Sequence, residues 1–162
     1  MSRTIDVCLS PDLMHLYDVS RHAIVVVDIL RATSCMTTAF AHDVESITPF
    51  SKLEECLAMK KSGYLTAGER DGKKVEGFDL GNSPFEYMNA SIKGKKIAFT
   101  TTNGTQAIAK SLNAHSIVIG SFLNLSAVTH YLEQTSEDIL VVCAGWKGRV
   151  NLEDTLFAGA LV

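Results

Sequence analysis

The chain has 162 residues, of which 46% are hydrophobic and 20% charged, and its formal net charge is −3 at pH 7. This length and composition predict a single globular domain. The acidic balance, without any basic run, argues against a general nucleic-acid-binding surface. No apolar stretch is long enough to span a membrane. We therefore expect a cytoplasmic protein that keeps its four widely spaced cysteines reduced.

Apolar periodicity predicts strands and helices that alternate along the chain. The strands are expected at residues 4–9, 24–29, 46–50, 64–67, 96–100, 116–119 and 139–143. The helices are expected at residues 31–41, 52–61, 104–112, 125–134 and 153–162, with a short helix opening at Ser83. Residues 68–82 read as a glycine-rich, charged loop. Such alternation predicts an α/β fold with right-handed crossovers, a layered, mostly parallel or mixed sheet, and helices on both faces.

The last predicted helix ends on Ala160, Leu161 and Val162, without a glycine, a proline or a polar tail. This ending indicates that the domain, residues 1–162, lacks its C-terminal part. An exposed apolar helix also favours association with another surface, so we expect a homo-oligomer.

The most informative segment is the apolar run at residues 25–27 and the polar residues that follow it. Asp28, Arg31, Thr33 and Ser34 come together where a buried strand ends and a helix begins. Open α/β sheets bind ligands at this edge, and the free N–H groups of a helix N-terminus attract anions. A carboxylate for a cation beside an arginine for an anion is the combination that phosphoryl transfer needs.

A second cluster lies in the predicted loop. Glu69 and Arg70 follow a glycine, and Asp79 lies within the run Gly-Phe-Asp-Leu-Gly-Asn-Ser-Pro. Hard cations such as Mg²⁺ bind carboxylate oxygens, so these acids are candidate metal ligands. We interpret Asp71 and the neighbouring lysines as solvated loop residues.

A third cluster follows the predicted strand at residues 96–100. It contains Thr101, Thr102, Asn103, Gly104 and Thr105. The glycine lets the backbone approach a ligand, and the N–H groups that follow can surround an oxyanion. A simple capped turn between strand and helix explains the same residues.

Two more clusters complete the set. Ser121 and Asn124 follow one predicted strand, while Cys143 and Arg149 follow another with the spacing of cysteine phosphatases. That spacing predicts a nucleophilic thiolate. A buried cysteine at a strand end, however, is more often inert packing. Lys147 lies between them, and Glu153 and Asp154 open the last helix, where acids suit the helix dipole.

Taken together and in this order, these clusters resemble the 2-phosphosulfolactate phosphatase family. The stretches that carry the resemblance are VDILRATS (27–34), GER (68–70), GFDLGNSP (77–84), TTNGT (101–105), GSFLN (120–124), CAG (143–145) and LED (152–154). Each is weak alone, but their order across most of the chain is specific. The resemblance implies an α/β fold of the family's own type.

The resemblance also implies a Mg²⁺-dependent hydrolase that removes phosphate from 2-phospho-3-sulfolactate, a substrate of coenzyme M biosynthesis in methanogens. This small acid carries a phosphate, a sulfonate and a carboxylate, so it requires several cationic or N–H-rich pockets. We expect in-line attack by a metal-activated water. Two alternatives stay open, namely a phosphatase that uses Cys143 covalently and a non-catalytic anion-binding domain.

The residues expected in each role follow from these clusters. The catalytic candidates are Asp28, Arg31 and Asp154. The metal-ligand candidates are Asp28, Glu69, Asp79 and Glu153. The substrate-binding candidates are Arg31, Thr33, Ser34, Arg70, Thr101, Thr102, Asn103, Gly104, Thr105, Ser121, Asn124, Lys147 and Arg149.

Overall fold

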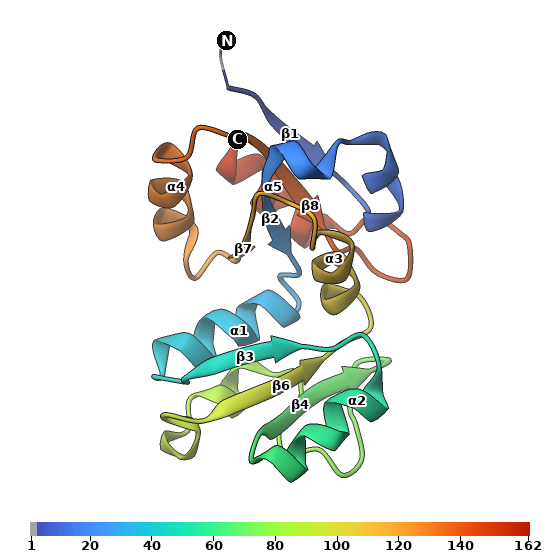
Figure 1. Cartoon of the computed structure of the whole chain (residues 1–162), viewed down its shortest axis with the longest axis vertical. Coiled ribbons are helices and arrows are strands. Elements are labelled where there is room, and N and C mark those ends of the chain that lie inside the picture. Colours follow the sequence, from blue (N-terminus) through green and yellow to red (C-terminus); the bar gives the residue numbers. More distant parts are fainter. Residues whose placement is uncertain (1–2) are drawn as a thin grey trace.

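The strands form two separate four-stranded sheets (Figure 1). The computed structural model describes residues 3–162. The first sheet is parallel and has the order β1 (Ile5–Cys8), β8 (Asp138–Cys143), β2 (His22–Val27), β7 (Ser116–Gly120). The second has the order β3 (Ser46–Pro49), β6 (Lys96–Thr100), β4 (Leu65–Arg70), β5 (Lys73–Lys74), in which β5 runs antiparallel to β4.

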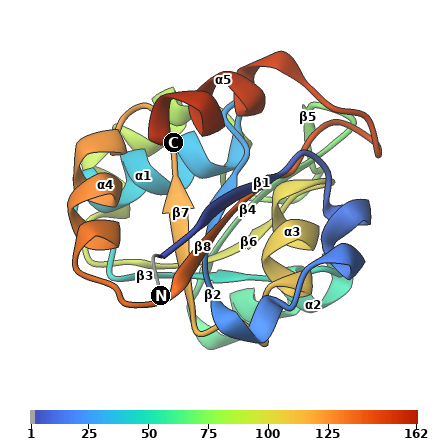
Figure 2. The same ribbon diagram turned by 90° about the horizontal axis from the view of Figure 1, so that it is seen from above.

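Helices separate and cover the two sheets. Between the sheets lie α1 (Ala32–Ala41) and α3 (Gly104–Lys110), as Figure 1 shows. The outer face of the first sheet packs against α4 (Leu125–Glu133) and α5 (Leu152–Leu161), which Figure 2 shows on the side away from α3. The second sheet packs against α2 (Leu53–Ala58). Short 3₁₀ segments are η1 (Pro11–Leu16), η2 (Val19–Arg21), η3 (Met59–Ser62), η4 (Pro84–Tyr87) and η5 (Ala90–Ile92).

The side chains of β2 show why the first sheet is buried on both faces. Ile24 and Val26 point into the central layer, where they join the core around α1 and α3. Val25 and Val27 point the other way, into the core under α4 and α5. Because successive strand residues alternate between faces, a strand buried on both sides must be apolar throughout.

The path of the chain places the second sheet between two strands of the first. After β2 the chain crosses through α1 to β3, and after β6 it returns through α3 to β7. The predicted α/β class is therefore confirmed, but the alternation implied one sheet and the structure has two. Periodicity identifies elements, whereas membership of a sheet depends on pairing between distant segments.

The predicted loop at residues 68–82 is partly wrong. Strand β4 continues to Arg70 and pairs with β5, so the loop opens with a tight hairpin. Its turn contains Asp71, whose φ is +54°, and Gly72. Glycine and charge content favoured a loop, but pairing across two residues of β5 outweighs that local preference.

Among residues 3–162, no helix combines the length and the apolar character needed to cross a membrane.

Gly120 at the end of β7 is expected to tolerate no side chain. A Cβ there would lie 2.7 Å from Cγ1 of Val25 and 2.8 Å from Cε1 of Phe157, both inside the core. Gly120→Ala should lower the free energy of unfolding by about 1–3 kcal/mol, measured by urea denaturation. Gly159→Ala is the matched control, because its Cβ meets nothing within 4 Å on α5. It should raise stability slightly, and equal effects of the two changes would contradict this account of the core.

Candidate functional site

Asp28 lies at the carboxyl end of β2, at the junction of the two sheets. Its side chain is 6% exposed. Oδ1 accepts a hydrogen bond from the N–H of Ala32 at 3.2 Å. Oδ2 lies against Gly104, where a Cβ would approach it to 2.8 Å. Gly104 is therefore required for close approach, and the first turns of α1 and α3 meet at this carboxylate.

Hydroxyl groups close the turn that carries Asp28. Thr33 Oγ1 accepts from the N–H of Asp28 at 3.0 Å and donates to its carbonyl at 2.9 Å. Ser34 Oγ donates to the carbonyl of Ile29 at 2.7 Å. Both were expected to bind substrate, and the structure shows them holding the turn. Arg31 is half-buried beside them and donates to the carbonyl of Gly72 at 3.4 Å.

Asp154 joins α5 to the same turn. It is fully buried in the first turn of α5. Its Oδ1 accepts from the N–H of Ile29 at 2.8 Å, and its Oδ2 accepts from the N–H of Gly145 at 3.0 Å. The carboxylate thus ties together the ends of β2 and β8. Glu153 lies beside it and is half-buried.

Glu69 brings a third carboxylate from the second sheet. It is 3% exposed and lies near the end of β4. Oε1 accepts from the N–H of Thr102 at 2.8 Å, and Oε2 accepts from the N–H of Gly72 at 2.6 Å. Glu69 therefore connects the hairpin turn after β4 with the loop after β6.

The neighbouring acids act on the pKa of Asp28. Burial, with the negative charges of Asp154 and Glu69, raises the pKa of Asp28 to about 7, against the hydrogen bonds from Ala32 and Gly104. Burial also raises the pKa of Asp154, although Ile29 and Gly145 donate to it. Within residues 3–162, no lysine, arginine or histidine pairs with any of the three. A buried acidic cluster of this kind attracts a cation.

The donor set suits a magnesium ion held mainly by water and substrate. In the part of the chain that the structure describes, no three His, Cys, Asp or Glu side chains are placed to hold a metal ion together. Mg²⁺ commonly uses only one or two protein carboxylates and keeps several waters. Asp28 and Glu69 meet that requirement, because each carboxylate oxygen that accepts an N–H retains a second lone pair.

The loop after β6 forms one wall of a small pocket. Thr101 and Thr105 hydrogen-bond to each other, with Thr105 Oγ1 donating to the carbonyl of Thr101 at 2.8 Å. Thr102 Oγ1 is buried and has no partner. The pocket, of about 170 Å³, also has Asn103, Lys147 and Gly148 in its lining. This loop was expected to bind substrate, and Thr102 and Asn103 line a cavity of suitable size.

Lys147 links this pocket to the hairpin of the other sheet. Its Nζ lies 2.5 Å from Oδ1 of Asp71 and 5.6 Å from the ring centroid of Trp146. Its backbone N–H donates to Oδ1 of Asn103 at 3.1 Å. Arg149 is exposed in the same loop. Asp71 is exposed, as its interpretation as a solvated loop residue requires, and it also pairs with a lysine that lines the pocket.

Several expected site residues lie elsewhere or are otherwise engaged. Asp79 accepts from the N–H and hydroxyl of Thr66 and pairs with Lys60 at 3.0 Å. Burial alone would raise the pKa of Asp79, but these hydrogen bonds outweigh it and lower the value. Unlike Glu69, Asp79 already has a cationic partner in Lys60, and this ion pair gives no support for a metal-ligand role.

Arg70 points away from Glu69. Its guanidinium donates to Oγ1 of Thr100 at 2.9 Å and to the carbonyl of Glu69 at 2.7 Å. Its charge also acts on Cys56 of α2, on the outer side of the second sheet. Since adjacent strand residues face opposite sides, Glu69 and Arg70 cannot both face the central layer.

Ser121 and Asn124 close the turn between β7 and α4. The N–H of Ser121 donates to Oδ1 of Asn124 at 2.8 Å, and Asn124 Nδ2 donates to the carbonyl of Ile119 at 2.9 Å. Ser121 Oγ also donates to Thr37 of α1 at 3.2 Å. These contacts account for both residues structurally, and their expected binding role stays a prediction.

Cys143 is poorly suited to nucleophilic attack. It is fully buried and packs in the core beneath α4 and α5. Burial, together with the charge of Asp154, raises the pKa of the thiol to about 12. A thiolate is the reactive form, so this environment favours inert packing.

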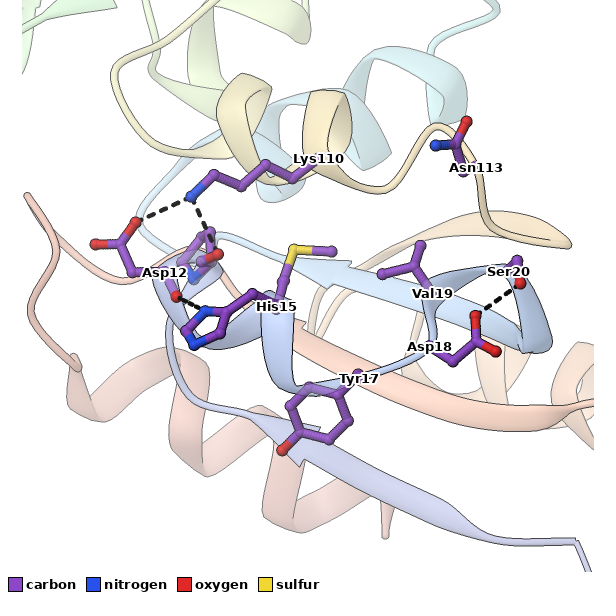
Figure 3. A pocket seen from close by; sticks show the side chains of 10 residues that line it. Asp12, His15, Tyr17, Asp18, Val19, Ser20, Lys110 and Asn113 are labelled. Atoms are coloured by element: carbon purple, nitrogen blue, oxygen red, sulfur yellow. Dashed lines mark hydrogen bonds and ion pairs between the residues drawn. The ribbon is translucent and has the colours of Figure 1, made fainter.

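A larger cavity lies away from the carboxylates. It has a volume of about 570 Å³ and lies between η1, η2 and α3 (Figure 3). Asp12 pairs there with Lys110 at 2.9 Å, and His15 Nδ1 lies 2.7 Å from the carbonyl of Asp12. None of the three carboxylates lines it.

Comparison with known proteins identifies the family. The family model described as 2-phosphosulpholactate phosphatase matches residues 8–162. The chain belongs to the 2-phosphosulpholactate phosphatase family. In this chain the motifs described above converge on Asp28, Glu69 and Asp154.

Similar proteins carry the same description in several bacteria. A probable 2-phosphosulfolactate phosphatase of Thermotoga maritima is 53% identical over 138 residues, or 85% of this chain and 60% of that protein. The one of Caldanaerobacter subterraneus subsp. tengcongensis is 44% identical over 148 residues, or 89% and 61%. The one of Clostridium acetobutylicum is 39% identical over 161 residues, or 98% and 68%. The chain thus spans about 60% of the length of the first two relatives.

Two residues of this family member escaped the sequence analysis. The pairing of Asp71 with Lys147 was not predicted, because a surface ion pair between distant loops has no sequence signature. Asn82 lies inside the quoted GFDLGNSP motif, yet only its acid was selected. Its place in that motif was the sequence feature that could have indicated it. The structure adds that Asn82 is buried, with 8% of its surface exposed.

Replacing Asp28 should stabilise the fold at high pH. Because the pKa of Asp28 is about 7 when folded and 3.8 in its ordinary state, the folded protein binds the proton more tightly. Stability is therefore lost as pH rises between these values. At about 1.4 kcal/mol per pKa unit, Asp28→Asn should gain roughly 2–3 kcal/mol over wild type between about pH 5 and pH 8.

Urea denaturation in EDTA at both pH values measures this gain. Asp43→Asn is the control, since Asp43 is exposed and paired with Lys93. An Asp28→Asn difference that does not change with pH would show that the acidic cluster is not coupled as described.

Proposed function

We propose that this chain acts as a Mg²⁺-dependent phosphatase that hydrolyses (2R)-2-phospho-3-sulfolactate to 3-sulfolactate and inorganic phosphate, with water as the nucleophile. Family membership and the names of its relatives support the substrate. The observation that carries the proposal is the buried cluster of Asp28, Glu69 and Asp154 without a paired cation. Such a cluster beside an anion-sized pocket is what phosphoryl transfer through a cation requires.

Asp28 and Glu69 are the residues that would hold the magnesium ion. When bound, the ion would neutralise negative charge on the phosphoryl group and lower the pKa of a water molecule bound to it. Asp28 and Glu69 come from different sheets, so they fix the relative position of the two halves of the site. Asp154 is the candidate acceptor for the proton of the attacking water, because burial raises its pKa and makes the carboxylate a stronger base.

The anionic groups of the substrate need cations and N–H donors. Lys147 and Asn103 line the pocket next to the cluster, and the Thr102 hydroxyl is a donor without a partner. Arg31 lies at the entrance to α1, where it reaches the carbonyl of Gly72. These groups would bind the phosphate, sulfonate and carboxylate of the substrate, whereas the carboxylates of the cluster would face the cation.

Phosphate release from 2-phosphosulfolactate tests the proposal. We expect turnover by the 162-residue chain with Mg²⁺ and none with EDTA, and Asp28→Asn should lower kcat by about 100-fold or more. Asp43→Asn should leave turnover unchanged, since Asp43 lies in an exposed ion pair with Lys93. Turnover that resists EDTA but is lost on thiol alkylation would instead favour Cys143. Binding of sulfolactate without turnover would favour an anion-binding domain.

Replacing Lys147 and replacing Asp71 should change the affinity for phosphate in opposite directions, because the two residues form an ion pair. An anion in the pocket competes with Asp71 for the lysine. Lys147→Met should therefore weaken phosphate binding by about three- to tenfold, whereas Asp71→Asn should strengthen it by a similar factor. Isothermal titration of inorganic phosphate measures both. If the pair only joins two loops, both changes will alter affinity in the same direction.

A further inference from the structure

Asn82 is a buried amide whose oxygen has no hydrogen-bond partner. The residue is 8% exposed, and Oδ1 is inaccessible to water. An unpaired buried polar atom of this kind destabilises the folded state. Native proteins rarely accept this cost unless a ligand or ordered water completes the site.

The backbone holds Asn82 beside the end of β4. Leu80 bridges Ala67 in parallel, and its carbonyl accepts from the N–H of Gly68 at 3.1 Å. Gly81 is then fixed by Glu86 and Tyr87, at 2.8 and 2.7 Å. Asn82 follows directly, so it leaves the edge of β4 close to Gly68, just before the point where Lys74 of β5 pairs with Glu69.

The element that follows Asn82 leads to the same layer. Segment η4 begins two residues later and packs against α1, the helix whose first turn holds Asp28. Figure 1 shows α1 spanning the space above the second sheet. The motif therefore runs from the edge of β4 to α1, between the strand that carries Glu69 and the helix that follows Asp28.

A second unpaired atom flanks Glu69 from the other side. Within residues 3–162, three buried side-chain atoms lack a partner, on Asn82, Thr102 and Ser116. Thr102 donates its backbone N–H to Glu69 at 2.8 Å. Two of the three unpaired atoms thus belong to segments that flank the end of β4, the strand that carries Glu69.

The chemistry of the proposed substrate restricts what Asn82 can contact. Phosphate, sulfonate and carboxylate groups are hydrogen-bond acceptors at neutral pH, so an amide oxygen gains nothing from them. Hard cations, in contrast, accept amide carbonyl oxygens as ligands. Resting on the proposed function, we propose that Asn82 is a neutral oxygen ligand, direct or through one water, of the cation held at Asp28 and Glu69.

The test measures Mn²⁺ as a spectroscopic substitute for Mg²⁺, by electron paramagnetic resonance on the substrate-free chain. Asn82→Ala should weaken Mn²⁺ binding about tenfold or more. Asn82→Asp should bind Mn²⁺ as tightly as wild type or more tightly, because it keeps the oxygen and adds charge. Asn113→Ala, an exposed asparagine, is the control and should change nothing. Urea denaturation in EDTA confirms that each variant is folded.

Three results would overturn the inference. The first is no Mn²⁺ binding by the wild-type chain. The second is an Asn82→Ala dissociation constant within about twofold of wild type. The third is weakening by Asn82→Asp as severe as by Asn82→Ala, which would show that the site needs the amide N–H and not the oxygen. Because Mn²⁺ binding is measured without substrate, failure of phosphate release by wild type would count against the proposed function alone.

Discussion

The arrangement depends on burying three carboxylates where two sheets meet. Asp28, Glu69 and Asp154 are each less than 7% exposed, and backbone N–H groups are the partners that hold them. Hydrogen bonds lower the free energy of each charge, but they do not cancel the burial and the repulsion that raise the pKa of Asp28. The fold therefore keeps an unfavourable charge cluster in its interior, which a bound cation would relieve.

The path of the chain explains how acids so distant in sequence converge. Inserting the second sheet between β2 and β7 brings the carboxyl ends of β2, β8, β4 and β6 around one point. Close approach needs Gly104, whose missing side chain leaves space for Asp28. Relatives in the same family are longer than this chain. The three carboxylates nevertheless all lie within residues 28–154. The pocket beside them is lined by residues of the same range, together with Pro11 and Asp12 of η1.

Much of this site could be predicted from the sequence because ligands gather at the carboxyl ends of parallel strands. That rule selected Asp28, and the glycine-framed sequence GER selected Glu69, although nothing in this sequence shows that the two acids belong to different sheets. It failed to separate Glu69 from Arg70, since their opposite directions depend on strand register. Asp79 was selected for its charge, and only the hydrogen bonds from Thr66 reveal its structural use. Asn82 was passed over because burial of a neutral amide is a tertiary property.

The most direct test of the acidic cluster is the titration of Asp28, followed by the carboxyl ¹³C shift in NMR spectra. Without a metal ion, we predict a pKa of about 7 for Asp28 in the wild-type chain. Glu69→Gln should lower the pKa of Asp28 because it removes a negative charge. Saturating Mg²⁺ should lower the pKa of Asp28 in the wild-type chain by more than this substitution does. A pKa near 3.8 in both proteins, unchanged by Mg²⁺, would contradict the claim that these carboxylates form one coupled cation site.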